Sequence, residues 1–486
     1  MKPLHLLPLF LSFAIASTAH SQPLMLTKEQ AMKDFQSLRF ALEYVHPRLY
    51  KYDDKATVDK RFDSLASRIG NQISRLDFLA LVSVANASVR CGHLYTIPQG
   101  ELEKAILGKK IMPFHVRVIG DRLYIMDDGS KASIPNGSEI SKINGRSGKE
   151  ILTAMLPGIA ADGYIETRKR RLIERTFYNS FHGFDLYYYL HVDRSETFKV
   201  EYIDYKTKKS KTVTIDGVLP EHRVDNNSWF KTPSPAFVLD KPNNIAVLTI
   251  SRSFHDRSVD PDFDLFVKSV FQTINENNIG NLVLDLRNNE GGDEHQQMVL
   301  MSYLFDKPFK LYENIYLSHL DFRPLKNIII ERDTSQLLFN NDDGYMRKIN
   351  DNLWINNYDY SDNLVLQPPG ENVFKGKLYV LMNGITFSSA ADLVADIKRT
   401  NEAIFIGEES GGLYEGPTGG DAIVIQLPNS KIMVRMSPNI QMGYMYQQYP
   451  VGRGVQPTHE VNYTIKDIVE KKDLELELAR ELIRSN

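Results

Sequence analysis

The spacing of apolar residues predicts helices at the start of the chain. Apolar residues recur at helical intervals over residues 31–45, until Pro47 ends the run. The same periodicity predicts two further helices over residues 55–69 and 76–89. We therefore predict an N-terminal helical domain over residues 22–105.

From about Pro113 onward, apolar and polar residues alternate, which is typical of strands. The sequence FHVRVIGDRLYIMDD, residues 114–128, predicts a hairpin that turns at Gly120 and Asp121. The later stretch NGSEISKING predicts a strand that ends in an Asn-Gly turn. It resembles the core of a PDZ domain, so we expect a PDZ-like, β-rich domain over residues 106–220. Such domains bind an extended peptide at a sheet edge, whereas a hairpin domain without a ligand is the alternative.

Strands and helices alternate in the last half of the chain, which indicates an α/β domain over residues 236–486. Apolar runs at residues 245–250, 282–286 and 377–382 have the length of buried strands, and a helical pattern follows each of them. Residues 307–375 are irregular and rich in Asn and Asp, which favours an insertion or a lid, and we expect it to wall the cleft. The expected fold class is therefore α/β and multi-domain.

The N-terminal residues 1–21 have the pattern of a secretory signal peptide. An apolar run from Leu6 to Ile15 follows a lysine and precedes small residues, and cleavage is expected after Ala19 or Ser21. The run is too short to span a bilayer, and no later segment has the ~18 consecutive apolar residues of a membrane helix. We therefore expect an exported protein, periplasmic or extracellular, without a membrane span; a buried N-terminal helix is the alternative.

Composition and charge exclude several classes of function. The formal net charge of −3 over 486 residues gives no indication of nucleic-acid binding or of a basic membrane anchor. Cys91 is the only cysteine, so an intrachain disulfide is impossible, and its simplest role is that of a small buried side chain. No metal-binding or dinucleotide-binding motif occurs, so we expect neither a metal nor a cofactor. The oligomeric state stays open.

Two serines, Ser388 and Ser389, stand where an apolar strand turns into a helix. This position lifts a side chain to the carboxyl end of the strand and points it at free N–H groups of the helix, which stabilise negative charge. A nucleophilic serine needs such a position, because the amide that follows it can bind an oxyanion. Ser or Thr before a helix is also a common cap, and the pattern alone leaves both roles open.

A glycine-rich turn, RNNEGG, leaves another buried strand and contains Gly291 and Gly292. If the two strands are parallel, this turn lies at the same sheet edge as the serines. Glycine lets backbone amides approach a bound group closely, so these residues are candidates for the second half of an oxyanion hole. A tight strand-to-helix turn without further function is the alternative.

Together the two stretches resemble the S41 peptidases, the tail-specific or C-terminal processing proteases with their tricorn-core and retinoid-binding relatives. The family's DLRxNxGG motif is matched by Asp285, Leu286, Arg287, Asn288, Asn289, Gly291 and Gly292. Its NGxTxSxAE…GE block is matched by Asn383, Gly384, Thr386, Ser389, Ala390, Ala391, Gly407 and Glu408. The resemblance implies a crotonase/ClpP-like α/β catalytic core behind the helical and PDZ-like domains. It also implies that Ser389 is the nucleophile, because it stands three residues before the acidic position, where Asp392 replaces the usual glutamate.

The same resemblance implies the identity of the base. One branch of the family uses a lysine downstream of the serine, but this chain has Tyr414 at that point and no lysine between Lys398 and Lys431. The tricorn-like branch uses a histidine that follows the helical segment in a Gly-His sequence, which Gly92 and His93 match. His93 is therefore the expected general base, since imidazole titrates near neutral pH.

A third group should orient the histidine. In the tricorn-like branch it is a carboxylate in an EGRGVxPD context, which this chain matches as VGRGVQPT. Val451 and Thr458 stand where the two acids would be, so the acid is missing or supplied elsewhere. Candidates by neighbourhood alone are Glu408, Glu409, Glu415 and Asp421.

The resemblance thus implies a serine peptidase that acts on peptides or on protein C-termini, and the signal pattern predicts that it is exported. Ser389 would attack the scissile carbonyl, and His93 would act as base and then as acid. Amides near Gly291, Gly292 and Ala390 would stabilise the oxyanion. The expected partner is a peptide or protein substrate. One alternative is a peptide- or apolar-ligand-binding protein of the same fold with weak or no hydrolysis, and another is a non-enzymatic PDZ scaffold.

Overall fold

The computed structural model describes most of the chain beyond the predicted signal peptide, residues 1–21, which lies outside the described residues. The described residues are 25–98, 100–175, 182–222, 234–254, 260–330, 337–339, 341, 344–356, 361–400 and 402–485. Within these ranges, no helix is both long enough and apolar enough to cross a membrane.

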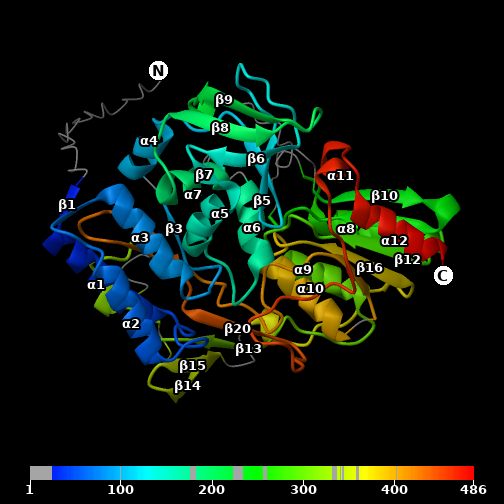
Figure 1. The fold of residues 1–486 in the computed structure, drawn as a ribbon. Helices are drawn as coiled ribbons and strands as arrows, with labels where there is room; N and C mark the ends of the chain where they lie inside the picture. Colours follow the sequence, from blue (N-terminus) through cyan, green and yellow to red (C-terminus); the bar gives the residue numbers. More distant parts are fainter. Residues whose placement is uncertain are drawn as a thin grey trace, which may run out of the picture.

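A six-stranded sheet forms the centre of the C-terminal half, on the right of Figure 1. Its strands are, in order, β10 (Ala236–Asp240), β11 (Ile245–Thr249), β12 (Asn281–Asp285), β16 (Lys377–Met382), β17 (Ile404–Gly407) and β21 (His459–Glu460). The edge strand β10 is antiparallel to β11, and all other pairings in this sheet are parallel. Because β12 and β16 are parallel, the glycine-rich turn and the serine turn leave the same edge of the sheet.

Helices cover both faces of this sheet, since its parallel strands are apolar on both sides. Leu282 and Leu284 of β12 pack in a core with three helices on one face. Val283, between them, points to the other face and packs in the core of the C-terminal helix. The helices are α8 (Phe263–Glu276), α9 (Glu294–Leu304) and α10 (Ser389–Thr400) on the first face and α12 (Leu474–Arg484) on the second, preceded by α11 (Ile465–Val469). The mixed helix-and-sheet architecture confirms the predicted α/β fold class.

A second, antiparallel sheet lies above the first in Figure 1. It consists of β4 (His115–Ile119), β5 (Arg122–Met126), β6 (Ser138–Ile143), β8 (Thr197–Ile203) and β9 (Ser210–Asp216), with β7 (Arg146–Ser147) paired to β6. The predicted hairpin at Gly120 and Asp121 is confirmed as β4–β5. Its core also contains α5 (Gly148–Met155), α6 (Glu166–Glu174) and α7 (Gly183–His191). Ile385 of the serine turn is buried in this same core and so joins it to the α/β sheet. The PDZ-like assignment stays a prediction.

The N-terminal helices begin at capping residues. Thr27 caps α1 in a capping box with Gln30, and Ser74 accepts a hydrogen bond from the amide of Asp77 at the start of α3. These elements are β1 (Met25–Thr27), α1 (Lys28–Val45), α2 (Lys55–Ala66), β2 (Gln72–Ser74), α3 (Arg75–Ala87) and α4 (Glu101–Leu107). The domain boundaries proposed from the sequence stay predictions.

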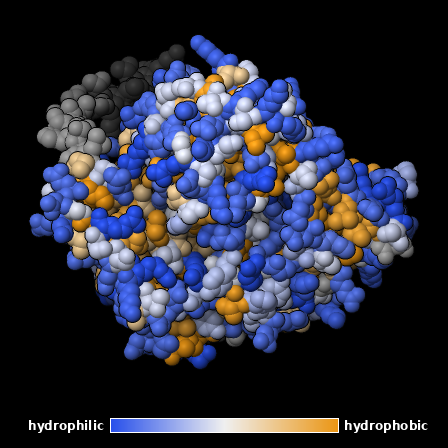
Figure 2. Space-filling model, viewed as in Figure 1, coloured by the Kyte–Doolittle hydropathy of each residue, from blue (hydrophilic) through white to orange (hydrophobic). Residues whose placement is uncertain are grey.

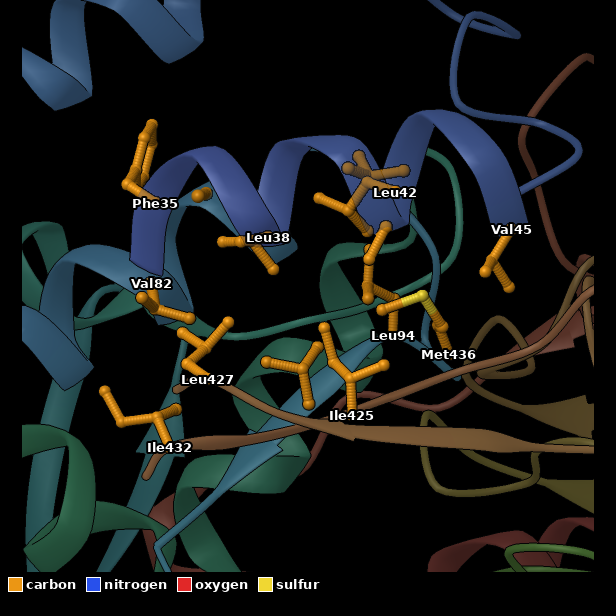
Figure 3. Close-up of a cluster of buried hydrophobic side chains, with 14 of the residues drawn as sticks. Phe35, Leu38, Leu42, Val45, Val82, Leu94, Ile425, Leu427, Ile432 and Met436 are labelled. Atoms are coloured by element: carbon orange, nitrogen blue, oxygen red, sulfur yellow. The ribbon is translucent and has the colours of Figure 1, made fainter. Parts of the chain in front are cut away.

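These helices share their core with a hairpin near the other end of the chain (Figure 3). Leu38 and Leu42 of α1 lie over Ile425 and Leu427 in one continuous cluster. The hairpin consists of β18 (Ile423–Gln426) and β19 (Met433–Met436), and β3 (Tyr95–Ile97) pairs with β19. The segment that carries His93 is therefore anchored to the C-terminal half of the protein.

Residues 307–375 are more regular than the sequence indicated. They contain β13 (Tyr312–Leu317), β14 (Met346–Asn350) and β15 (Leu353–Asn356), which form a sheet with β20 (Asn439–Gly443) in the order β14-β15-β13-β20. The prediction of an irregular segment was wrong here for two reasons. Strand β14 exposes nearly all its side chains and shows no alternation, and β13 pairs with a strand far away in the sequence.

The face of the molecule in Figure 2 is mostly hydrophilic, and its hydrophobic residues form small, separate patches. Large apolar side chains exposed in the described chain include Val238 and Leu265. Isolated apolar residues of this kind are normal on soluble proteins. The sheet edge with its two turns therefore remains the strongest candidate site.

Candidate active site

The serine turn places Ser388 in a strained backbone conformation. The chain leaves β16 at Met382, turns through Asn383 and Thr386, and enters α10 at Ser389. Ser388, immediately before the helix, has φ = 53°, which L residues adopt rarely and at a cost of order 1–3 kcal/mol. Such strain is concentrated at functional sites, and here it lifts one hydroxyl out of the turn at the helix N-terminus.

The glycine-rich turn is interlocked with the serine turn by hydrogen bonds. The Asn288 amide donates to Asn383 Oδ1 at 3.1 Å, and Asn383 Nδ2 donates to Asn288 Oδ1 at 3.0 Å. The Phe387 amide donates to the carbonyl of Asn289 at 2.9 Å. Asn289 also accepts from the Gly291 amide at 2.8 Å. These bonds fix the two turns relative to one another, because each side-chain amide satisfies a group on the opposite turn.

Both glycines lie directly beside the serine turn, Gly291 through its backbone and Gly292 through its amide. A Cβ on Gly291 would lie 2.6 Å from the carbonyl oxygen of Phe387 and 2.7 Å from the amide nitrogen of Ser389, so only glycine fits. Gly291 also has φ = 82°, which favours glycine. The Gly292 amide donates to Ser389 Oγ at 2.9 Å. The expected placement of these amides beside the serine turn is thus present.

His93 comes to this turn from the other half of the molecule. It lies between α3 and β3, and the amide of Gly92 before it donates to Asp162 Oδ1 at 2.6 Å. Its Nε2 is 3.1 Å from Ser388 Oγ. Its ring stacks on Phe387 with centroids 4.5 Å apart. One hydroxyl, one imidazole and the glycine turn therefore meet at the predicted edge of the sheet.

The hydroxyl beside His93 belongs to Ser388, and not to Ser389 as the sequence motif indicated. That expectation was counted back from Asp392, but the Asp392 side chain points away and its Oδ2 accepts from the hydroxyl of Tyr312 at 3.3 Å. Ser389 instead turns its hydroxyl to Gly292. The acidic position therefore does not mark the serine that His93 contacts.

The Ala390 amide, expected from the sequence to help bind the oxyanion, has a hydrogen-bond partner in the turn. The Ala390 N–H already donates to the carbonyl of Phe387 at 3.2 Å. The amide that directly follows Ser388 is that of Ser389, and it has no hydrogen-bond acceptor in the described part of the chain. This N–H lies beside Gly291. Because Ser389 directly follows Ser388, it is a free donor next to the Ser388 hydroxyl.

Comparison with known proteins relates part of the chain to one family. Residues 244–432 match the family model described as Peptidase family S41. This region belongs to peptidase family S41.

Solved structures similar to this chain include two of CPAF. The structure of mature CPAF complexed with lactacystin has a TM-score of 0.62 at 16% identity, and the alignment covers 94% of this chain and 99% of CPAF. The crystal structure of mature CPAF has a TM-score of 0.60 at 16% identity, covering 94% and 96%. This likeness shows that the fold is shared. No curated protein matched the sequence.

The S41 region contains only part of the site. Gly291, Gly292, Ser388 and Ser389 lie inside residues 244–432, whereas His93 lies far before them. The histidine is thus brought to the S41 region by the β3–β19 pairing and by the shared N-terminal core.

His93 is buried and electrically neutral at neutral pH. Burial lowers its pKa well below the ordinary value of 6.5, and the nearby charges of Arg435 and Arg168 lower it further. A neutral imidazole with Nε2 at a serine hydroxyl can accept the serine proton. The low pKa also means that the resulting imidazolium is poorly stabilised.

No carboxylate orients His93 in the described part of the chain. Its Nδ1 is buried and has no hydrogen-bond partner there. The acids considered from the sequence are engaged elsewhere or exposed: Glu408 binds Arg171, Glu409 binds Arg453, Glu415 pairs with Lys51, and Asp421 is exposed. Val451, at the expected acidic position, has 66% of its surface exposed. The imidazole is therefore held by packing, between Phe387 and Gly419.

A polar cleft opens beside the two turns. It has a volume of about 570 Å³ and runs between α6, the carboxyl ends of β11 and β12, and the segment before α12. Its walls include Asn288, Asn383 and Ile385, but neither His93 nor Ser388. The cleft thus reaches the rear of the interlocked turns, and the Ser388–His93 pair lies outside its walls.

Sequence reasoning missed Phe387, which stacks on the histidine, and Arg168, which lies over the Phe387 ring. Phe387 directly precedes the two serines, and that position was the only signal that the sequence offered for it. Arg168 gave no signal, because its role depends on the packing of α6 against a turn more than two hundred positions later in the chain.

Proposed function

We propose that the protein is an exported serine peptidase in which Ser388 is the nucleophile and His93 is the general base. The single observation that supports this assignment best is the 3.1 Å contact between His93 Nε2 and Ser388 Oγ at a strained strand-to-helix turn. Membership of residues 244–432 in Peptidase family S41 supports peptide hydrolysis as the reaction.

In the proposed acylation, Ser388 Oγ attacks the carbonyl carbon of the scissile peptide bond and His93 Nε2 takes the hydroxyl proton. The carbonyl oxygen becomes an oxyanion, which the amides of Ser389 and Gly292 are placed to stabilise. His93 then gives the proton to the leaving amine, and the C–N bond breaks to leave an acyl group on Ser388.

In the proposed deacylation, water attacks the ester carbonyl while His93 takes its proton. The ester bond to Ser388 breaks, and the proton passes to Ser388 Oγ, which restores the enzyme. The Gly292 amide is engaged with Ser389 Oγ in the free protein. Substrate binding therefore has to replace this hydroxyl, or share the amide with it, when the oxyanion forms.

The other domains have proposed roles that rest on the sequence. Residues 1–21 direct export, and the PDZ-like region at residues 106–220 holds an extended chain near the site. Ile385, buried in that region's core, gives the serine turn a direct contact with it. Release of a mature chain that begins after Ala19 or Ser21 would test the export proposal.

The test of function is hydrolysis of an unfolded protein by the purified mature chain, with Ser388→Ala as the inactive control. We expect new N-termini to appear with the wild type and not with Ser388→Ala. The second candidate function, binding without hydrolysis, is favoured by one observation, the missing acid at His93 Nδ1. Equal binding of peptides by both proteins without any cleavage would support it and contradict the peptidase.

A further inference from the structure

Arg168 of α6 places a positive charge in the interior beside the serine turn. Its side chain is only 7% exposed. Its Cζ lies 3.5 Å from the centroid of the Phe387 ring, in a cation–π contact. Phe387 in turn stacks on His93 and directly precedes Ser388. One aromatic ring therefore separates this guanidinium from the imidazole.

The hydrogen-bond donors of Arg168 are not satisfied. Its Nε and Nη1 are buried and have no partner in the described part of the chain. Its Nη2 is 3.7 Å from Glu290 Oε1, which is longer than a hydrogen bond. Burial lowers the pKa of Arg168 to about 10, so the group is still charged at neutral pH. A buried cation with unused donors is costly, and an acceptor from outside would remove that cost.

The carboxylates near Arg168 do not form hydrogen bonds with it. Glu290 is shared with Arg175, so one carboxylate serves two guanidinium groups. Asp162 attracts Arg168, but its Oδ1 is used by the Gly92 amide and it makes no ion pair with Arg168. Arg168 is therefore left without a hydrogen-bonded carboxylate in the described part of the chain.

We propose that Arg168 binds a carboxylate of the peptide substrate, supplied either by an acidic side chain near the scissile bond or by the C-terminus. The inference rests on the proposed function and names its substrate class. A planar guanidinium presents paired N–H groups that match a carboxylate, and such bonds are strong where water is excluded. The position beside Phe387 puts the bound carboxylate within a few residues of the bond that Ser388 attacks.

This binding has a consequence for His93. The charge of Arg168 is one of the causes that hold the pKa of His93 low. A carboxylate on Arg168 would offset that charge and make His93 a better base when the correct substrate is bound. The substrate would then supply part of the electrostatic support that a triad carboxylate gives, which the described chain lacks at Nδ1.

The test compares matched peptides on matched variants. Peptides from a mixed library that the wild type cleaves are resynthesised in pairs, with a free or amidated C-terminus and with Glu or Gln at each position flanking the cut. The variants are Arg168→Met and Arg168→Lys. The control is Arg170→Met on the same helix, whose side chain is partly exposed and binds Asp121. Thermal unfolding verifies that each variant is folded.

We expect the wild type to cleave one carboxylate form about 10- to 100-fold faster in kcat/KM than its neutral partner, which is the effect of a charged hydrogen bond. In Arg168→Met this ratio should fall to about 1, Arg168→Lys should keep part of it, and Arg170→Met should keep all of it. If the free and amidated peptides show the ratio, Arg168 binds the C-terminus. If the Glu and Gln peptides show it, Arg168 binds an acidic side chain.

Equal rates on both members of every pair, or an unchanged ratio in Arg168→Met, would overturn the inference and leave the peptidase standing. A structural role alone would slow both members equally. If no peptide is cleaved, the proposed function fails, and the inference is decided by binding to Ser388→Ala. Tighter binding of carboxylate peptides that Arg168→Met abolishes would support it, and equal binding would overturn it.

Discussion

The two halves of the candidate site are held in place by different forces. In the serine half, Asn288 and Asn383 exchange hydrogen bonds. Gly291 packs so closely against the backbone of the serine turn that no side chain fits there. In the histidine half, the ring of His93 is held by stacking on Phe387, and its Nδ1 has no partner in the described chain. The first half is defined by directional bonds and the second by packing, so the two should respond differently to mutation and to pH.

The largest effect should separate the two adjacent serines. Ser388→Ala removes the hydroxyl at His93 and should lower kcat by roughly 10³-fold or more, because loss of a nucleophile leaves only binding and oxyanion stabilisation. Ser389→Ala removes only the hydroxyl at Gly292 and should change kcat by less than about 10-fold. Steady-state hydrolysis measures both. A larger loss of kcat in Ser389→Ala than in Ser388→Ala would indicate that Ser389, the motif position, is the nucleophile.

The next effect should come from the glycine turn. Gly291→Ala forces a Cβ to within 2.6 Å of the Phe387 carbonyl and should shift the turn, with a loss of about 10²-fold in kcat. Gly145→Ala is the matched control, because Gly145 has φ = 83° against 82° for Gly291 but nothing within 4 Å of its Cβ. Similar kcat values for the two variants would contradict the role of close packing at Gly291.

The pH dependence should reveal the state of His93. The imidazole acts as a base only when neutral, so activity is retained above its folded-state pKa and lost below it. An ordinary histidine with a pKa of about 6.5 would leave about a tenth of the activity at pH 5.5. Because burial, Arg435 and Arg168 lower the pKa of His93, we expect kcat/KM at pH 5.5 to stay within about 2-fold of its value at pH 7. An acid limb centred at or above pH 6.5 would contradict this.

The smallest effect concerns the stability of the histidine half. Burial, together with Arg48, lowers the pKa of His46 at the end of α1 to about 3. Below pH 6.5 this histidine is protonated in the unfolded chain, whereas in the folded chain it stays neutral down to about pH 3. The free energy of unfolding therefore decreases as the pH falls from 6.5 to 3. Each pH unit costs about 1.4 kcal/mol, or roughly 2 kcal/mol between pH 6.5 and 5.

Denaturant unfolding of wild type and His46→Gln at pH 7 and pH 5 measures this effect. The acid-induced loss should be smaller in His46→Gln by about 2 kcal/mol. His295→Gln, at an exposed histidine, should keep the wild-type loss. The same loss in all three proteins would mean that His46 does not cause the decrease in the free energy of unfolding at low pH.

Local signals were enough to predict the serine half from the sequence. The buried strands and the strand-to-helix junctions at both turns follow from periodicity and turn chemistry. The choice between Ser388 and Ser389 did not follow. Spacing cannot show which of two neighbouring residues adopts φ = 53°, and Asp392 was a poor reference because it turns toward Tyr312.

The histidine half depends on contacts that local patterns do not contain. His93 was assigned only through the family resemblance, and its position depends on β3 pairing with β19 near the other end of the chain. The strands β13 to β15 were missed for the same reason, since their pairing partners are distant or their side chains are exposed. Arg168 is the extreme case, because only packing brings it to Phe387.

The central claim is that Ser388 is the reactive serine. The most direct measurement is to treat the mature protein with a fluorophosphonate, digest it and locate the phosphonyl group by mass spectrometry. We predict a single adduct on Ser388, kept in Ser389→Ala and strongly reduced in His93→Ala. An adduct on Ser389 that survives in Ser388→Ala would contradict the account.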